Sequence, residues 1–137
     1  MIMAQTTNLE SEVIAKWIVD GQILFIDVRV SMTDKMPVYD QMIVDYLDTA
    51  TTDTVDLIIR LPKPKQAPPS LKRLTSYKYQ QHPRLGYVVM IGLDVSPIIR
   101  FLISSAAKIR RMKMQTFATL DEAVFFLKGV RHINTIP

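Results

Sequence analysis

The alternation of apolar and polar stretches predicts a chain of short strands and helices. Two β-rich runs, at residues 13–19 and 23–30, flank Asp20-Gly21-Gln22, and Asp-Gly between apolar runs is a strong hairpin signal. A third strand is predicted at 55–61, where Pro62 ends the pairing. The unbroken apolar run at 87–91 is typical of a central strand covered on both faces. A last short strand is predicted at 116–119, at an edge of the sheet.

Four helices are predicted between and after these strands. Residues 38–47 carry apolar side chains on one stripe, and residues 70–81 begin at Ser70 as N-cap and end before Pro83. A third helix follows Ser96-Pro97, and its predicted buried stripe includes Ile98, Ile99, Leu102, Ile103, Ala106 and Ile109. The last helix has Thr119 as N-cap, Glu122 completing a capping box and Gly129 as terminator.

The resulting order, β-β-α-β-α-β-α-β-α, predicts an α/β protein with a mixed sheet of about five strands and helices packed on the sheet. We expect one domain over residues 1–137, with flexible termini at 1–11 and 131–137. Residues 62–70 hold four of the eight prolines and are predicted to form a loop.

Composition excludes several classes of protein. Apolar residues make up 48% of the 137 positions and charged residues 22%, a balance typical of globular domains. Cysteine is absent, which excludes disulfides and thiolate metal sites. We find no secretory signal at the start and no apolar run of the roughly 20 residues needed to span a bilayer. A soluble, cytoplasmic protein without membrane insertion is the expectation.

The net charge of +4 conceals two unlike halves. Residues 1–60 contain 4 Lys/Arg and 10 Asp/Glu, giving −6, whereas residues 61–137 contain 13 and 3, giving +10. Such asymmetry indicates either an anionic partner or halves that face each other, within one molecule or between two. The basic residues are spread over several elements, which argues against nucleic acid and leaves a homodimer open.

The sequence predicts no catalytic residue, no cofactor site and no metal site. His82 and His132 have no ligand partner at useful spacing, and His82 is interpreted as a solvated residue at a helix end. The chain has only four glycines and no phosphate-loop pattern, which argues against a glycine-rich nucleotide-binding loop. Asp27 is expected on the exposed face of its strand. The remaining acidic candidates, expected on a solvated helix face, are Asp40, Asp45 and Asp48.

Three features have both a functional and a plain structural interpretation. Ser70 could accept a phosphate near Lys72 and Arg73, or act only as an N-cap. A basic face could meet an acidic partner or lipid headgroups, or be simply solvated. A tyrosine set near the proline loop could line a pocket, or belong to the core. The basic face comprises Arg100, Lys108, Arg111 and Lys113, and the tyrosine set comprises Tyr77, Tyr79 and Tyr87.

Several motifs of the second half resemble those of the STAS-like domains, the fold of bacterial anti-sigma factor antagonists. More narrowly, the chain resembles short uncharacterised bacterial proteins of that fold, over about a third of its length. The matching residues are His82-Pro83, Leu85-Gly86, Val88 to Gly92, Arg100-Phe101-Leu102 and Phe117 to Leu127.

The resemblance places a regulated serine at the start of the helix after the third strand. The corresponding segment here is Pro68-Pro69-Ser70-Leu71, which lacks the acidic residue and the glycine of the family's turn. The resemblance therefore implies a regulatory or binding module with an altered partner surface and without a clear phospho-switch motif.

Our first functional hypothesis is a non-enzymatic module that binds a protein partner or itself. Apolar and basic side chains after the proline loop would supply the contact area and the charge preference. The alternative is a domain that binds a small apolar ligand or lipid, and an enzyme has the least support. The predicted partner surface comprises Ser70, Leu71, Lys72, Arg73, Leu74 and Tyr77, with Ser70 as the candidate modification site.

Overall fold

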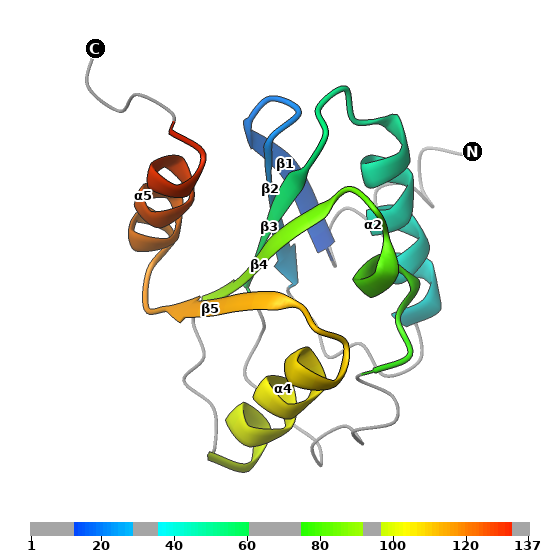
Figure 1. Cartoon of the computed structure of the whole chain (residues 1–137), viewed down its shortest axis with the longest axis vertical. Coiled ribbons are helices and arrows are strands. Elements are labelled where there is room, and N and C mark those ends of the chain that lie inside the picture. The colour runs from blue at the N-terminus through cyan, green and yellow to red at the C-terminus, as the bar shows by residue number, and fades with distance from the viewer. Residues whose placement is uncertain (1–12, 29–35, 61–74, 92–96, 133–137) are drawn as a thin grey trace.

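A computed structural model describes residues 13–28, 36–60, 75–91 and 97–132 (Figure 1). These residues form an α/β fold with a five-stranded sheet, three α-helices and one short 3₁₀ helix. The strands are β1 (Val13–Val19), β2 (Ile23–Val28), β3 (Val55–Arg60), β4 (Leu85–Ile91) and β5 (Lys113–Phe117). The helices are α2 (Met36–Thr49), the 3₁₀ helix η1 (Lys78–Gln81), α4 (Pro97–Ile109) and α5 (Leu120–Val130).

The strands lie in the sheet in the order in which they occur in the chain, β1-β2-β3-β4-β5. β1 pairs with β2 antiparallel, and the other neighbours pair parallel. The predicted hairpin and mixed sheet are therefore confirmed. Gly21 has a φ of +71° in the turn between β1 and β2, a conformation that glycine adopts without steric cost.

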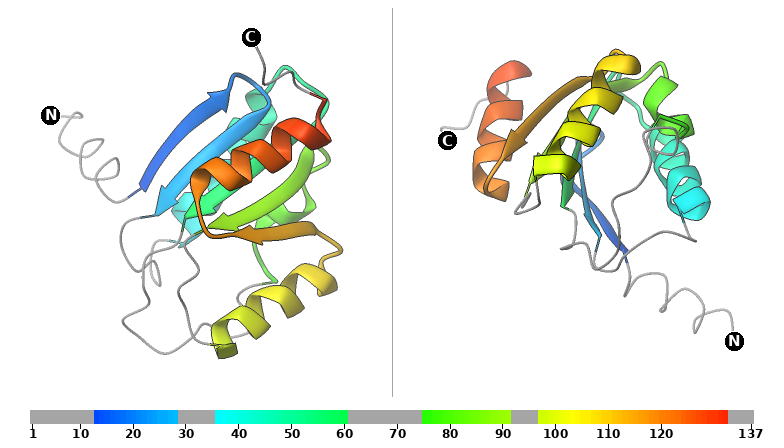
Figure 2. Two further views of the ribbon diagram at one scale, coloured as in Figure 1. Left: turned by 90° about the vertical axis from the view of Figure 1, so that its left-hand side faces the viewer. Right: turned by 90° about the horizontal axis from the view of Figure 1, so that it is seen from below.

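The sheet buries side chains on both faces, with α2 and η1 on one side and α5 on the other (Figure 2). Successive residues of β3 alternate between the two, since Leu57 faces α2 and Ile58 faces α5. The buried cluster on the α2 side comprises Val13, Leu24, Ile26, Val28, Tyr39, Ile43, Leu47, Ala50, Val55, Leu57, Ile59, Tyr79 and Val88. The cluster on the α5 side comprises Ile23, Phe25, Ile58, Val89, Ile91, Ala123 and Leu127.

α4 departs from the expected packing on the sheet, because it lies beside the edge strand β5, outside the layers of α2 and α5 (Figures 1 and 2). Ile103 and Ala106 are buried as predicted, but Ile109 is 57% exposed, so its placement in the buried stripe was wrong. A helix beside one edge strand buries a narrower stripe than a helix lying flat on a sheet. Phe101 is consequently 69% exposed as well.

The helix predicted for residues 70–81 is corrected within its described part. Residues 75–77 are not helical, and only Lys78–Gln81 form a 3₁₀ turn. The cause is the carboxylate of Asp40 on α2, which accepts hydrogen bonds from the backbone N–H groups of Lys78 and Tyr79 at 2.8 and 3.0 Å. These two hydrogen bonds fix the residue at which the 3₁₀ turn starts. Residues 61–74, with the predicted proline loop, lie outside the described residues.

Several predicted boundaries also shift. β5 begins at Lys113, earlier than predicted, and α2 extends to both sides of the predicted 38–47. Gly129 does not end α5, which continues to Val130; His132 instead takes the left-handed conformation, with φ of +59°. The N-terminal prediction is confirmed, because the Thr119 hydroxyl accepts a hydrogen bond from the N–H of Glu122. None of the helices described here has both the length and the apolar character required to cross a bilayer.

Candidate functional site

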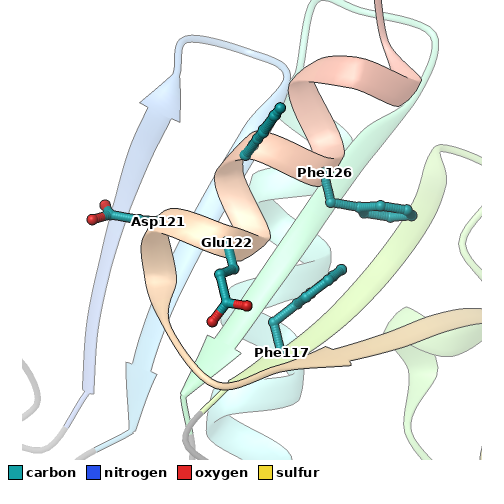
Figure 3. Close-up of a pocket in the computed structure, with 5 residues that line it drawn as sticks. Phe117, Asp121, Glu122 and Phe126 are labelled. Atoms are coloured by element: carbon teal, nitrogen blue, oxygen red, sulfur yellow. The ribbon is translucent and has the colours of Figure 1, made fainter.

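An aromatic hollow lies between the end of β5 and the first turns of α5 (Figure 3). Phe117 comes from β5, and Phe125 and Phe126 come from α5. Asp121 and Glu122 complete the lining. We refer to these five residues as the α5 hollow.

The floor of the hollow is held by packing against the sheet. The ring of Phe126 meets the ring of Tyr87 edge-on, with centroids 5.4 Å apart, and lies 5.3 Å from the ring of Phe117. Phe125 has no such support and is 65% exposed. Two adjacent phenylalanines on a helix point about 100° apart, so only one of them can face the sheet. The hollow therefore combines fixed rings with a projecting one.

The rim of the hollow is acidic. Asp121 and Glu122 occupy the first turn of α5, where the helix dipole favours negative charge. Glu122 also accepts a hydrogen bond from the Thr119 hydroxyl at 3.0 Å, which holds its carboxylate at the helix start. Both acids are exposed. An aromatic floor with a negative rim suits an apolar group that has a cation beside it.

A second exposed apolar surface lies on α4. Phe101 and Ile109 are 69% and 57% exposed, and Lys108, which is also exposed, lies two turns after Phe101 on the same side of the helix. We refer to Phe101, Lys108 and Ile109 as the α4 face. The predicted basic residues are exposed here, as expected, except that Lys113 extends over the ring of Tyr87 at 5.6 Å and thus belongs to the α5 side.

Of the predicted partner surface, only Tyr77 lies within the described residues, and Ser70–Leu74 lie outside them. Tyr77 is half-buried, stacks on Tyr79 with centroids 6.1 Å apart, and packs against the α2-side core. Tyr87 lies on the opposite face of the sheet, so the three tyrosines do not line one pocket, and Tyr79 belongs to the core, the second of the two interpretations. Burial raises the pKa of Tyr79 above its usual value.

The sequence analysis predicted solvent-exposed side chains for Asp40 and His82, but both side chains are largely buried and make hydrogen bonds that join parts of the fold. Asp40 is only 6% exposed. The His82 side chain is 11% exposed, with Nε2 2.7 Å from Asp48 Oδ1. Its Nδ1 accepts the backbone N–H of Arg84 at 3.1 Å, so in the neutral ring Nε2 carries the proton and donates to Asp48. The pair joins the end of α2 to the turn before β4.

Replacing Asp40 by alanine is expected to lower the free energy of unfolding by about 2 kcal/mol, because two backbone N–H groups lose a charged acceptor. Urea denaturation followed by Trp17 fluorescence measures the change. Asp45→Ala is the matched control on the same helix: Asp45 is exposed, and its loss should change the free energy by less than about 0.5 kcal/mol. Equal effects of the two substitutions would show that the two hydrogen bonds of Asp40 contribute nothing to the free energy of unfolding.

A buried ion pair between Arg131 and Asp56 links the C-terminal end of α5 to strand β3 of the sheet. Arg131 Nη1 lies 2.9 Å from Asp56 Oδ2, with side chains 13% and 3% exposed. Arg131 also donates to Gln22 Oε1 at 3.2 Å and to the Thr54 carbonyl at 2.9 Å, while Asp56 Oδ1 accepts the N–H of Tyr87 at 2.7 Å. The predicted flexible terminus therefore does not begin at residue 131.

Asp27 is likewise less exposed than predicted. Its side chain is 15% exposed and lies 3.6 Å from Arg60 Nη1. Among the residues with described positions, no group of three or more His, Cys, Asp or Glu side chains could hold a metal ion.

Comparison with protein-family models, with curated proteins and with solved structures gives no match for this chain. The candidate site therefore rests on its own geometry. The sequence analysis did not single out Phe117, Phe125 and Phe126. The adjacent pair Phe125-Phe126 in an amphipathic helix was the available signal, because one of the two rings must point away from the core.

Proposed function

We propose that this protein is a non-enzymatic interaction module of STAS-like fold that binds a protein partner through the α5 hollow. The observation that carries the proposal is Phe125, a large aromatic side chain 65% exposed beside two fixed rings. Aromatic side chains are enriched at protein interfaces and supply much of their binding energy. The acidic rim would give the module a preference for partners with basic residues around an apolar anchor.

The resemblance to STAS-like domains supports the regulatory part of this proposal, and the α/β order of the strands and helices is compatible with it. The segment Ser70–Leu74 remains a predicted second contact surface, with Ser70 as its candidate modification site. η1 and α5 lie on opposite faces of the sheet, so Tyr77 at the start of η1 and the α5 hollow would serve different contacts (Figure 2).

A photo-crosslinking amino acid at position 125 tests the proposal in cells that naturally produce the protein. We expect irradiation to join the chain to a protein, identified by mass spectrometry, because the side chain at 125 projects beside the hollow. The matched control is position 38 on α2, where Val38 is 53% exposed on the other side of the sheet. Absence of an adduct at 125, or equal adducts at both positions, would contradict the proposal. A small molecule retained in native mass spectrometry would favour the ligand-binding alternative instead.

A further inference from the structure

We infer that the partner in the α5 hollow is a second copy of this chain, which inserts Phe101 of its α4 face between Phe117, Phe125 and Phe126. The inference rests on the proposed function and names its partner. Its basis is that one chain carries two exposed apolar surfaces whose charges are opposite.

The α4 face has the composition that the hollow requires. Phe101 and Lys108 are seven residues apart on α4, which places them on the same side of the helix about 10 Å from each other. α4 itself carries two basic residues, Arg100 and Lys108, and no acidic residue. Phe101 is therefore a projecting aromatic ring within positive surroundings.

The α5 hollow has the complementary composition. Its lining is almost wholly apolar and is formed by three phenylalanine rings, and the acids Asp121 and Glu122 lie at its edge, where Asp121 points away from Phe117 and Phe126 (Figure 3). With Phe101 of the second copy among these rings, Lys108 of that copy would approach the acidic rim. Opposite charges around an aromatic contact set its orientation and exclude like-charged partners.

The two surfaces cannot meet within one molecule. β5 lies between α4 and α5, with α5 over one face of the sheet and α4 beyond the edge (Figures 1 and 2). Contact between them therefore joins different surfaces of two copies. Two copies could make this contact twice in a symmetric dimer, and otherwise the contact closes into a larger ring or extends into an open chain of subunits.

An anionic lipid surface would also suit an exposed phenylalanine among basic residues. We favour a second copy because a membrane would use the α4 face alone and leave the acidic aromatic hollow without a role. Self-association uses both surfaces.

Two single variants and their mixture test the inference. Phe101→Glu removes the α4 face but leaves the hollow, and Phe125→Glu damages the hollow but leaves the α4 face. We expect the wild-type chain to self-associate in analytical ultracentrifugation between about 1 and about 200 µM, a range suited to a small interface. Each variant alone should associate at least about tenfold more weakly. An equimolar mixture of the two should form a dimer and nothing larger.

Matched controls keep these results interpretable. Val38→Glu introduces the same charge at an exposed position outside both surfaces and should associate like the wild-type chain. Circular dichroism of each variant establishes that it is folded. Added salt should weaken the wild-type association, because the contact pairs opposite charges near the surface.

Three outcomes would overturn the inference: a monomeric wild-type chain at all concentrations, variants that associate like the wild-type chain, or a mixture that stays monomeric. A monomeric wild-type chain that still crosslinks through position 125 to a different protein would leave the proposed function standing. A monomeric chain without any such crosslink would contradict both. Retention on anionic vesicles that is lost in Phe101→Glu, without self-association, would assign the α4 face to a lipid surface.

Discussion

Replacing Gly86 by alanine is expected to lower the free energy of unfolding by about 3 kcal/mol or more. A Cβ at this position would overlap with Oδ1 of Asp56 and come within 3.4 Å of the backbone carbonyl oxygen of Val55. The Asp56 side chain would have to move, but it is buried and holds both the N–H of Tyr87 and the guanidinium of Arg131. Displacing it leaves charged and polar groups unpaired in the interior.

Urea denaturation with Trp17 fluorescence measures this loss, and Gly129→Ala is the matched control. A Cβ at Gly129 has no neighbour within 4 Å, and Gly129 lies inside α5. Alanine there should stabilise the protein by about 0.5–1 kcal/mol through its higher helix propensity. The same glycine-to-alanine change is thus expected to have opposite signs at two positions. A Gly86→Ala protein as stable as the wild-type chain would disprove the close contact.

The second large effect is expected for Arg131→Met, which should destabilise the protein by about 3–5 kcal/mol. Methionine retains much of the apolar stem but leaves the carboxylate of Asp56, 3% exposed, without its cation. The carbonyl of Thr54 and the amide oxygen of Gln22 lose their donors as well. The measurement is again the urea midpoint at an unchanged slope.

A double-mutant cycle separates the ion pair from the other bonds of Arg131. Asn at position 56 retains an acceptor for the N–H of Tyr87 but carries no charge. In the Asp56→Asn background, Arg131→Met should therefore cost at least about 1 kcal/mol less than in the wild-type chain. Additive effects would show that the charges do not interact. Lys128→Met, in the preceding turn of α5, controls for the loss of a positive charge at this helix end.

The parts of the fold that depend on neighbours in the chain were predictable from the sequence. Asp20-Gly21 specifies a hairpin because glycine adopts the positive φ of the turn, and Thr119 with Glu122 specifies a helix start through bonds between adjacent turns. The apolar run at 87–91 specifies a central strand for a similar reason, since it has no polar face to present to solvent.

The parts that depend on distant residues were not predictable in this way. Asp40 lies 38 residues before the N–H group of Lys78 that it binds, and Asp48 lies 34 residues before His82. In the sequence, both acids appear on the polar side of a helix, and only the fold brings donors to them. Ile109 was misplaced for the converse reason: the periodicity of a helix defines its apolar side but not how much of that side a neighbour covers.

The same limit applies to the candidate site. The sequence analysis placed the partner surface at residues 70–77, where basic and apolar side chains follow a proline loop. The α5 hollow depends instead on two pairs of rings, Phe126 with Phe117 and Phe126 with Tyr87, which meet only when β4, β5 and α5 are assembled. The spacing of these aromatic residues along the chain does not predict that their rings are in contact.

The strand order has a consequence for how the protein is made. Because each strand pairs with the one before it in the chain, a sheet can grow from β1 to β5 as the polypeptide leaves the ribosome, without waiting for a distant partner. The bonds of Arg131 are different, since 75 residues separate it from Asp56 and 109 residues separate it from Gln22. If the sheet grows in this order, Asp56 pairs with Arg131 only after all five strands have been translated, and the contact between α5 and the sheet forms last.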